Sequence, residues 1–162
     1  MEYLPYIEKK IALSAENASR LLNMWKFRNE KIVFTNGCFD IIHRGHIEYL
    51  AKAASLGTKL IVGLNTDASV RRLKGENRPV NDERGRALAL ASLLFVDEVI
   101  LFNTDTPREL IEFIQPDVLV KGGDYRPEDI VGNDIVTARG GQVVTIPLVE
   151  GYSTTSIIEH LK

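Results

Sequence analysis

The sequence predicts an α/β protein built on a Rossmann-like, doubly wound parallel sheet of five strands. Short runs rich in β-branched residues recur along the chain, and helical patterns separate them. The runs lack a regular polar–apolar alternation, which indicates strands covered on both faces. Alternation of strands and helices is the pattern of a parallel sheet with helical crossovers. The five predicted strands are Lys31–Thr35, Lys59–Leu64, Glu98–Leu101, Asp117–Val120 and Gln142–Ile146.

Helical spacing of apolar residues predicts the elements between these strands. Thr106 is a suitable N-cap and Pro107 an early residue for one of them. Residues 13–27, behind a Ser14 cap, predict a further helix that packs on the sheet. Right-handed crossovers would place the carboxyl ends of the strands, and the ligand crevice, at one edge. The helical stripes are Ala18, Leu21, Leu22 and Trp25; Ile47, Leu50, Ala51 and Ala54; Leu88, Ala91, Ser92 and Phe95; and Leu110, Ile111 and Ile114.

Length and composition predict one cytoplasmic domain. The 162 residues fit a single domain, 1–162, with 1–30 as a helical extension packed on it. Twenty basic and twenty-two acidic residues give a net charge of −2, which argues against a nucleic-acid binder. No run of the sequence reaches the length of a membrane span. The sole cysteine, Cys38, excludes an intrachain disulfide.

The most informative motif follows the first predicted strand. Asn36–Asp40 leads into His43-Arg44-Gly45-His46, where the next helix begins. A helix N-terminus favours phosphate because its N–H groups are unpaired and it carries a partial positive charge. Two histidines three residues apart can flank one anionic group. Without a cluster of cysteines or carboxylates they are a poor zinc pattern, and neither a P-loop nor a dinucleotide fingerprint is present.

This composite motif resembles the signature of the cytidylyltransferase-like nucleotidyltransferases. The resemblance covers about residues 31–162 and implies transfer of a nucleoside monophosphate from a triphosphate to a phosphorylated substrate. It implies charge stabilisation by His43 and His46, and it makes Cys38 incidental to catalysis. The nucleotide-binding candidates within the motif are Asn36, Gly37, Phe39, Asp40 and Gly45.

Basic residues after the second strand supply further candidates. By the same resemblance, Lys74 is a mobile lysine that reaches the triphosphate, and Arg86 is a catalytic arginine on the next helix. Arg84 is interpreted as an ordinary surface charge, and Arg78 stays ambiguous. A basic stretch alone is typical of a solvated helix face, but here it follows a strand end. The substrate-binding candidates in this region are Asn65, Asp67 and Arg72.

Two later segments complete the predicted site. Lys121–Tyr125 follows the fourth strand, and its two glycines form either a plain turn or a loop on which a base can lie. Glu150–Ser156 opens the last helix with several hydroxyls, more than an N-cap requires, and resembles the family's Ser-x-Thr motif. The candidates are Lys121, Gly122, Gly123 and Asp124 from the first segment, and Ser153, Thr154 and Thr155 from the second.

The closest resemblance within the family is to adenylyltransferases that make ADP-activated heptose. It lies in the segments 65–69, 72–75, 78–81, 121–125 and 153–155. In many bacteria that activity is fused to a sugar kinase, so the chain resembles a stand-alone version. The alternative is a glycerol-3-phosphate cytidylyltransferase, which typically has Met-Gly-Asp-Asp-Trp at 121–125 and an arginine in place of Leu148. A nucleotide-binding regulatory module without catalysis is the non-enzyme alternative.

The resemblance implies a direct displacement. A sugar 1-phosphate, D-glycero-D-manno-heptose 1-phosphate, attacks the α-phosphorus of ATP and expels pyrophosphate. His43 and His46 stabilise charge on the reacting phosphate, and Lys74, Arg86 and the Thr154–Thr155 helix start hold the triphosphate. Neither Cys38 nor Ser153 forms a covalent intermediate. Mg²⁺ is carried by the nucleotide, with no metal-ligating protein residues. We expect a homodimer or a higher homo-oligomer, because related enzymes commonly form dimers.

Overall fold

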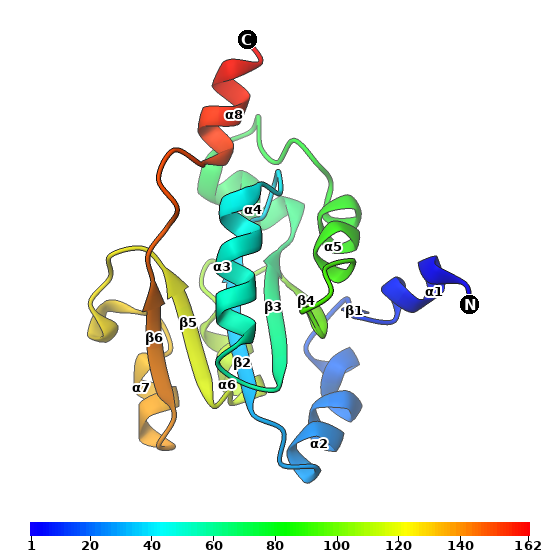
Figure 1. Cartoon of the computed structure of the whole chain (residues 1–162), viewed down its shortest axis with the longest axis vertical. Helices are drawn as coiled ribbons and strands as arrows, with labels where there is room; N and C mark the ends of the chain where they lie inside the picture. The colour runs from blue at the N-terminus through cyan, green and yellow to red at the C-terminus, as the bar shows by residue number, and fades with distance from the viewer.

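The computed structural model describes all 162 residues and contains one parallel sheet, in the order β1-β4-β3-β2-β5-β6 (Figure 1). All five strand pairings are parallel. The Rossmann-like α/β fold is thereby confirmed. The strands are β1 (Ile11–Ala12), β2 (Ile32–Gly37), β3 (Lys59–Asn65), β4 (Glu98–Phe102), β5 (Val118–Gly122) and β6 (Gln142–Ile146).

The sheet has six strands, so the predicted number of five is one too few. The additional strand, β1, pairs with β4 at the edge, with Ile11 opposite Val99 and Ala12 opposite Ile100. The Val99 N–H also donates a hydrogen bond of 2.7 Å to the Lys10 carbonyl. Two residues are too short to produce a strand pattern in a sequence, because the pairing depends on a partner almost ninety positions away.

The helices cover both faces of the sheet. Two further short turns are 3₁₀ helices, at Glu16–Ala18 and Pro127–Asp129. None of the helices has the length and apolar character needed to cross a membrane. The helices are α1 (Tyr3–Glu8), α2 (Ser19–Phe27), α3 (Arg44–Ala54), α4 (Asp67–Lys74), α5 (Glu83–Ala91), α6 (Arg108–Ile114), α7 (Asn133–Ala138) and α8 (Thr154–His160).

Two of the predicted helical stripes need correction. In α3 the buried residues are Gly45, Tyr49, Leu50 and Ala53, so the inward face is rotated from the predicted one and Ile47 is 41% exposed. The helix α5 ends at Ala91 and buries Arg86, Ala87, Leu90 and Ala91, which leaves Ser92 and Phe95 beyond it. Small residues let a helix approach the sheet closely, so a face predicted from the spacing of apolar residues can be misplaced where small residues are buried. The stripe of α6 is confirmed, since Leu110, Ile111 and Ile114 are all buried.

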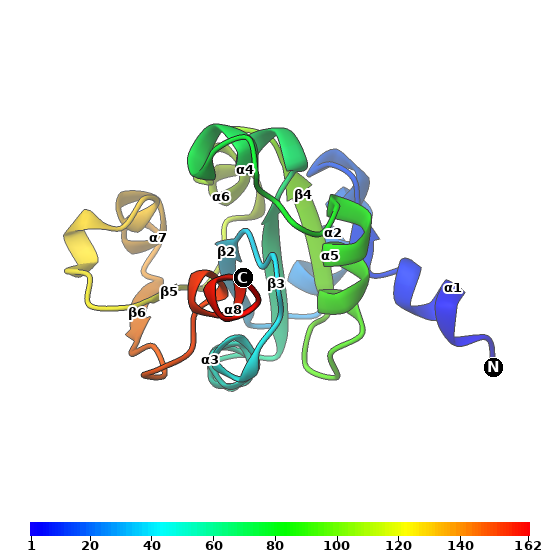
Figure 2. The same cartoon turned by 90° about the horizontal axis from the view of Figure 1, so that it is seen from above.

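Two apolar clusters lie on the two faces of the sheet. One joins α3 and α5 to inward-facing residues such as Val33 and Val62. The other joins α2, α6 and α7 to residues such as Phe34 and Ile61. Consecutive strand residues thus point into different clusters, and both faces are apolar, as for a sheet covered on both sides. Figures 1 and 2 show this layering, with α8 above the upper edge of the sheet.

The strand order fixes where a ligand can bind. The strand β2 lies between β3 and β5, so the chain winds outward in one direction from β2 to β3 and in the other from β2 to β5 and β6. Ligands of such sheets bind at this switch point, outside the carboxyl ends of the strands. Those ends here are Asn36–Gly37, Asn65 and Lys121–Gly122.

Glu98, at the start of β4, is a buried carboxyl group with an uncompensated oxygen. The residue is 4% exposed, and its Oε2 atom has no hydrogen-bond partner in the protein. Burial raises the pKa of Glu98 to about 8, with a further upward contribution from Asp97 and an opposing one from Lys10. The folded protein therefore holds a proton on Glu98 at neutral pH that the unfolded chain releases.

This proton gives the protein a pH-dependent stability. Because the folded pKa lies above the unfolded one, the free energy of unfolding falls as pH rises from about 4.5 to 8. We predict that Glu98→Gln raises the melting temperature at pH 9, by about 2–4 °C for each kcal/mol recovered, and has a smaller effect at pH 5. Thermal unfolding across this pH range measures it, with Glu128→Gln on the surface as the control. Equal effects at both pH values would contradict the assignment.

Candidate active site

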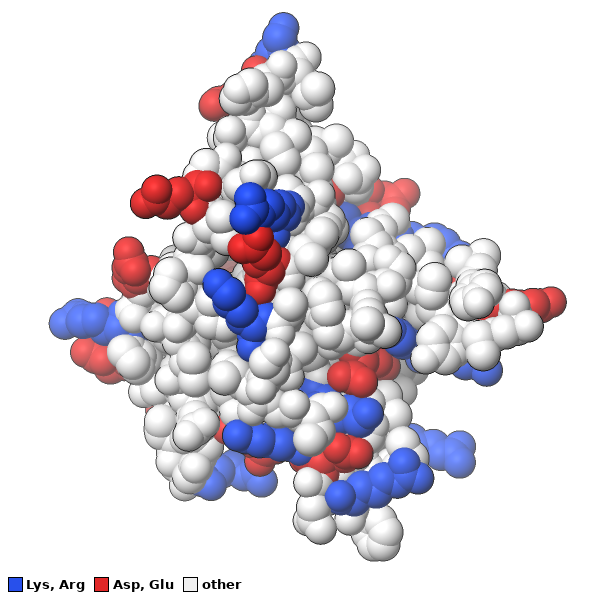
Figure 3. Space-filling view, in the orientation of Figure 1, with Lys and Arg blue, Asp and Glu red and all other residues white.

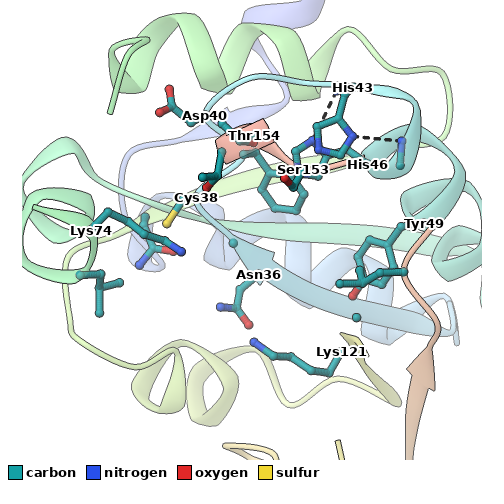
Figure 4. Close-up of a pocket in the computed structure, with 18 of the residues that line it drawn as sticks. Asn36, Cys38, Asp40, His43, His46, Tyr49, Lys74, Lys121, Ser153 and Thr154 are labelled. Atoms are coloured by element: carbon teal, nitrogen blue, oxygen red, sulfur yellow. Dashed lines mark hydrogen bonds between the residues drawn. The ribbon is translucent and has the colours of Figure 1, made fainter. Parts of the chain in front are cut away.

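A cavity of about 700 Å³ lies at the carboxyl ends of the central strands. It gathers the end of β2, the start of α3, the end of α4, the end of β5 and the segment before α8. Figure 4 shows the histidines, Lys74 and Lys121 around it. Fourteen sequence-predicted residues line it: Asn36, Gly37, Phe39, Asp40, His43, Gly45, His46, Asn65, Lys74, Lys121, Gly122, Ser153, Thr154 and Thr155.

The two histidines form a compact pair at the N-terminus of α3. Their rings stack at a centroid distance of 3.8 Å, and Phe39 meets the His46 ring edge-on at 5.3 Å. His43 caps the helix, since its Nδ1 accepts a 3.1 Å hydrogen bond from the Gly45 N–H. The Nδ1 of His46 in turn accepts from the His43 N–H at 3.4 Å. The helix start therefore fixes both rings (Figure 4).

Both imidazoles are neutral in the ligand-free protein. Burial lowers the pKa of His46 to about 4, with a contribution from His43, while a backbone hydrogen bond at Ile41 acts in the opposite direction. Burial also lowers the pKa of His43. A ring nitrogen that accepts a hydrogen bond carries no proton, so the proton of each neutral ring lies on Nε2. The pair offers N–H donors rather than full positive charges.

The segment before α8 is held against the start of α3. The Arg44 guanidinium lies 5.5 Å above the Tyr152 ring and donates a 3.4 Å hydrogen bond to the Tyr152 hydroxyl. A side chain on Gly45 would come within 3.2 Å of the Tyr152 Cβ, so glycine permits this approach. Ser153 caps α8 by accepting from the Ser156 N–H at 3.0 Å. Its hydroxyl is the one that an ordinary cap requires, which leaves Thr154 and Thr155 as the extra hydroxyls.

Asp40 is an internal anchor within the cavity wall. The residue is 3% exposed, and its carboxylate accepts hydrogen bonds of 2.9 Å from the N–H groups of Val80 and Asn81 and from Nε of Arg78. The Asn81 amide donates back to the Asp40 carbonyl at 2.7 Å. Burial acts upward, but these hydrogen bonds and the Arg78 charge outweigh it and hold the pKa of Asp40 below its ordinary value. Asp40 thus fixes the segment between α4 and α5.

Arg86 does not reach the cavity, contrary to the predicted direct contact with the triphosphate. Its side chain is fully buried, and every nitrogen of the guanidinium is hydrogen-bonded within the protein. Nε donates to the Asn81 carbonyl at 3.1 Å. Nη1 donates to the carbonyls of Cys38 and Asn65 at 2.7 and 2.8 Å, and Nη2 donates to Asp67 at 2.7 Å. Arg86 therefore ties the ends of β2 and β3 to α5.

Four other predicted residues also lie outside the cavity lining. Asp67 is the ion-pair partner of Arg86. Arg72 instead reaches the Asn103 backbone and the Asp105 carboxylate. Gly123 and Asp124 lie beyond the end of β5, and Gly123 has a positive φ of 107° typical of a turn. Each was placed by its closeness in sequence to a strand end, which does not determine the direction of a side chain.

Sequence reasoning missed several residues of the cavity wall. Tyr49 lines it from α3, and its hydroxyl lies 2.7 Å from the buried Thr35 hydroxyl. Burial raises the pKa of Tyr49 to about 12. Leu148 lies against Gly122, where an added Cβ would come within 2.9 Å of it. Arg78, which the sequence left ambiguous, also belongs to the wall. The spacing of Tyr49 from His46, one helical turn, is a signal that could have identified it.

The charges that face a ligand are local to this cavity. Basic and acidic side chains are interspersed over the molecular face in Figure 3. The cavity lining contains Lys74, Arg78 and Lys121, and its aspartates Asp40 and Asp105 are each paired with an arginine. The balance within the cavity therefore favours an anionic ligand.

The Cytidylyltransferase-like family model matches residues 34–160. The chain belongs to this family. The matched region includes both histidines and the Ser153–Thr155 segment. The family comprises nucleotidyltransferases, so the chain is a nucleotidyltransferase that acts on a nucleotide substrate.

Two relatives named bifunctional protein HldE are similar along most of the chain. The protein from Nitrobacter hamburgensis is 55% identical over 153 residues, which is 94% of this chain and 31% of the relative. The protein from Campylobacter jejuni subsp. jejuni is 57% identical over 155 residues, which is 96% of this chain and 32% of the relative. The chain thus spans about a third of the length of these curated relatives.

Solved structures share the fold. A lipopolysaccharide core biosynthesis protein from Thermoplasma volcanium superimposes with a TM-score of 0.61 at 27% identity, over 76% of this chain and 99% of that one. A pantoate–beta-alanine ligase from Francisella tularensis gives a TM-score of 0.63 at 16% identity, over 91% of this chain and 75% of the ligase. At that identity the second likeness concerns the fold alone.

The contacts of Arg86 predict a structural role. We expect Arg86→Lys to lower the free energy of unfolding by about 3 kcal/mol, because a lysine leaves Asp67 and several carbonyls without donors. Urea unfolding measures this loss, and Arg84→Lys on the exposed face of α5 is the matched control. The ATP affinity of the folded variant should stay within a few-fold of the parent. A variant of unchanged stability with lost ATP binding would restore the direct contact that the sequence predicted.

Proposed function

We propose that the protein transfers AMP from ATP to D-glycero-D-manno-heptose 1-phosphate, giving ADP-heptose and pyrophosphate. The observation that carries the proposal is the pair of Nε2–H imidazoles at the N-terminus of α3, in one cavity with Lys74, Thr154 and Thr155. The HldE relatives and the resemblance at residues 72–75 and 121–125 support the adenylyl and heptose assignments.

The reaction needs positioning more than bond-forming groups from the protein. An oxygen of the sugar phosphate attacks the α-phosphorus of ATP, a P–O bond forms, and the bond to pyrophosphate breaks. The acceptor phosphate is already anionic near neutral pH, so no base has to remove a proton. His43 and His46 donate hydrogen bonds to oxygens on which charge develops, and Lys74, Thr154 and Thr155 hold the triphosphate.

Because their imidazoles are neutral before binding, the histidines act first as hydrogen-bond donors. An adjacent phosphate favours the protonated ring, so nucleotide binding raises the pKa of both residues. The rings are already oriented by the start of α3, so little reorganisation accompanies the displacement. Cys38 and Ser153 form no covalent intermediate, because the acceptor oxygen attacks phosphorus directly.

The residues of the cavity fit magnesium carried by the nucleotide. No group of three or more His, Cys, Asp or Glu side chains is arranged to hold a metal ion. Asp40 and Asp67 face arginines and Asp105 pairs with Arg72, so their carboxylates are engaged. Magnesium commonly retains waters and binds substrate phosphates, where it neutralises charge. We place the enzyme in the cytoplasm, as a homodimer or higher homo-oligomer.

The substrate pair is the most direct test. We predict that pyrophosphate release is fastest with ATP and heptose 1-phosphate when ATP, CTP and GTP are each combined with heptose 1-phosphate and glycerol 3-phosphate. The preference should appear in kcat/KM. CTP with glycerol 3-phosphate as the best pair would replace the proposal with a glycerol-3-phosphate cytidylyltransferase. Nucleotide binding without turnover of any pair would indicate a regulatory module.

The histidine pair provides a second test. We predict that His46→Ala lowers turnover by about 10²–10³, as for loss of one preorganised donor, while ATP binding is largely kept. Pyrophosphate release measures turnover, and calorimetry measures ATP binding. The matched control is His160→Ala, since His160 lies exposed on α8, outside the cavity lining, and is hydrogen-bonded to the Ser156 carbonyl. Equal turnover in His46→Ala and the parent would remove His46 from the mechanism.

A further inference from the structure

Arg78 is a cavity residue held in place by Asp40. Its Nε donates a 2.9 Å hydrogen bond to the Asp40 carboxylate, which is 1% exposed, whereas the Arg78 side chain is 18% exposed. The same carboxylate accepts from the N–H groups of Val80 and Asn81, so the backbone that follows Arg78 is fixed as well. The guanidinium is therefore positioned by a buried, negatively charged anchor.

The outer half of this guanidinium remains available. Nη1 and Nη2 of Arg78 have no hydrogen-bond partner in the protein, and the residue lines the cavity. Arg86 shows the opposite arrangement, because protein groups use all three of its nitrogens. Two terminal nitrogens in a plane match two oxygens of a phosphate group. Arg78 thus has the geometry of a binding residue and Arg86 that of a structural one.

Arg78 belongs to a positively charged part of the cavity. Burial raises the pKa of the Cys38 thiol, and the charges of Lys74, Arg86 and Arg78 act in the opposite direction. All three cations are therefore near this thiol. The charge of Arg86 is compensated by Asp67 at 2.7 Å, which leaves Lys74 and Arg78 to face a ligand.

An adenylyl transfer must bind two phosphate-bearing reactants in one cavity. The attacking and leaving oxygens lie roughly in line, so the acceptor phosphate and the pyrophosphate need separate contacts. Three basic side chains line the cavity: Lys74, Arg78 and Lys121. The proposed function uses Lys74 for the triphosphate, and the ammonium of Lys121 lies 5.4 Å from the Tyr125 ring centre on the β5 side. Of the two basic residues besides Lys74, Arg78 is the one held in place by a buried carboxylate.

We propose that Arg78 binds the phosphate group of the acceptor, with Asp40 as its positioning residue. The inference rests on the proposed adenylyl transfer, but it concerns the phosphate and not the identity of the sugar. The acceptor is a phosphate monoester whose oxygens receive two hydrogen bonds from Nη1 and Nη2. Asp40, predicted from the sequence to bind the nucleotide, acts here through Arg78.

Arg78→Gln tests this role while it keeps one hydrogen-bond donor to Asp40. The glutamine amide nitrogen is as many bonds from the backbone as Nε of arginine, so it can still donate to Asp40. The substitution removes only Nη1, Nη2 and the charge. We predict an increase of about tenfold to a hundredfold in KM for the sugar phosphate, as expected for lost charged hydrogen bonds. KM for ATP should change less than twofold. The melting temperature should fall, because the buried Asp40 carboxylate loses its counter-charge, so both KM values are compared on the folded variant.

Arg84→Gln is the matched control, because Arg84 is exposed and pairs with Glu8 outside the cavity. It should leave both KM values unchanged. An equal or larger increase in KM for ATP in Arg78→Gln would assign Arg78 to the triphosphate and overturn the proposal. Unchanged KM values for both reactants would overturn it too.

A binding measurement separates this inference from the proposed function. Calorimetric titration with heptose 1-phosphate requires no turnover, and weaker binding to Arg78→Gln than to the parent supports the acceptor contact. Equal binding to the two proteins contradicts it. Should the substrate survey identify glycerol 3-phosphate as the acceptor, the same titration with that compound applies, because Arg78 contacts the group that both share.

Discussion

The buried guanidinium of Arg86 determines how the carboxyl ends of β2 and β3 meet. It donates to the carbonyls of Cys38 and Asn65, which directly follow the last residue pair between β2 and β3. A buried charge is costly unless it is paired, and Asp67 provides the pair. The loop that leads to the histidines therefore begins from a fixed point. The charge of Arg86 is used within the protein.

Asp40 extends this framework toward the ligand. Its carboxylate holds the α4–α5 segment by two backbone N–H groups, and the same segment supplies the Asn81 carbonyl that Arg86 binds. The two buried ion pairs thus share one stretch of chain. Groups held in this way need little reorganisation when charge develops on a substrate. The cavity wall between the strand ends and α5 is thus held by buried hydrogen bonds in the ligand-free protein.

Much of this arrangement followed from the sequence because it depends on local patterns. Buried β-branched runs identified five strands, and the expected right-handed crossovers placed Asn36, Lys121 and the histidines at one edge. The two-residue β1 was missed because it depends on a distant partner. The direction of Arg86 was also missed, because three of its four hydrogen bonds go to backbone carbonyls, up to 48 residues away. A carbonyl is present at every position, so no residue type signals that a buried arginine will bind it.

The arginines near the cavity are of two kinds: those whose nitrogens bind groups of the protein, and those with nitrogens left for a ligand. Arg72, Arg78 and Arg86 each pair with a carboxylate, but they differ in how many of their nitrogens are hydrogen-bonded within the protein. Arg86 has all three nitrogens engaged, Arg72 contacts Asp105 and Asn103, and Arg78 gives only Nε to Asp40. The positive charge that faces the cavity is therefore less than a count of basic residues suggests. What remains comes from Lys74 at the end of α4, Arg78 in the segment that follows it and Lys121 at the end of β5. Distributed charge of this kind suits two phosphate groups that have to be held apart and in line.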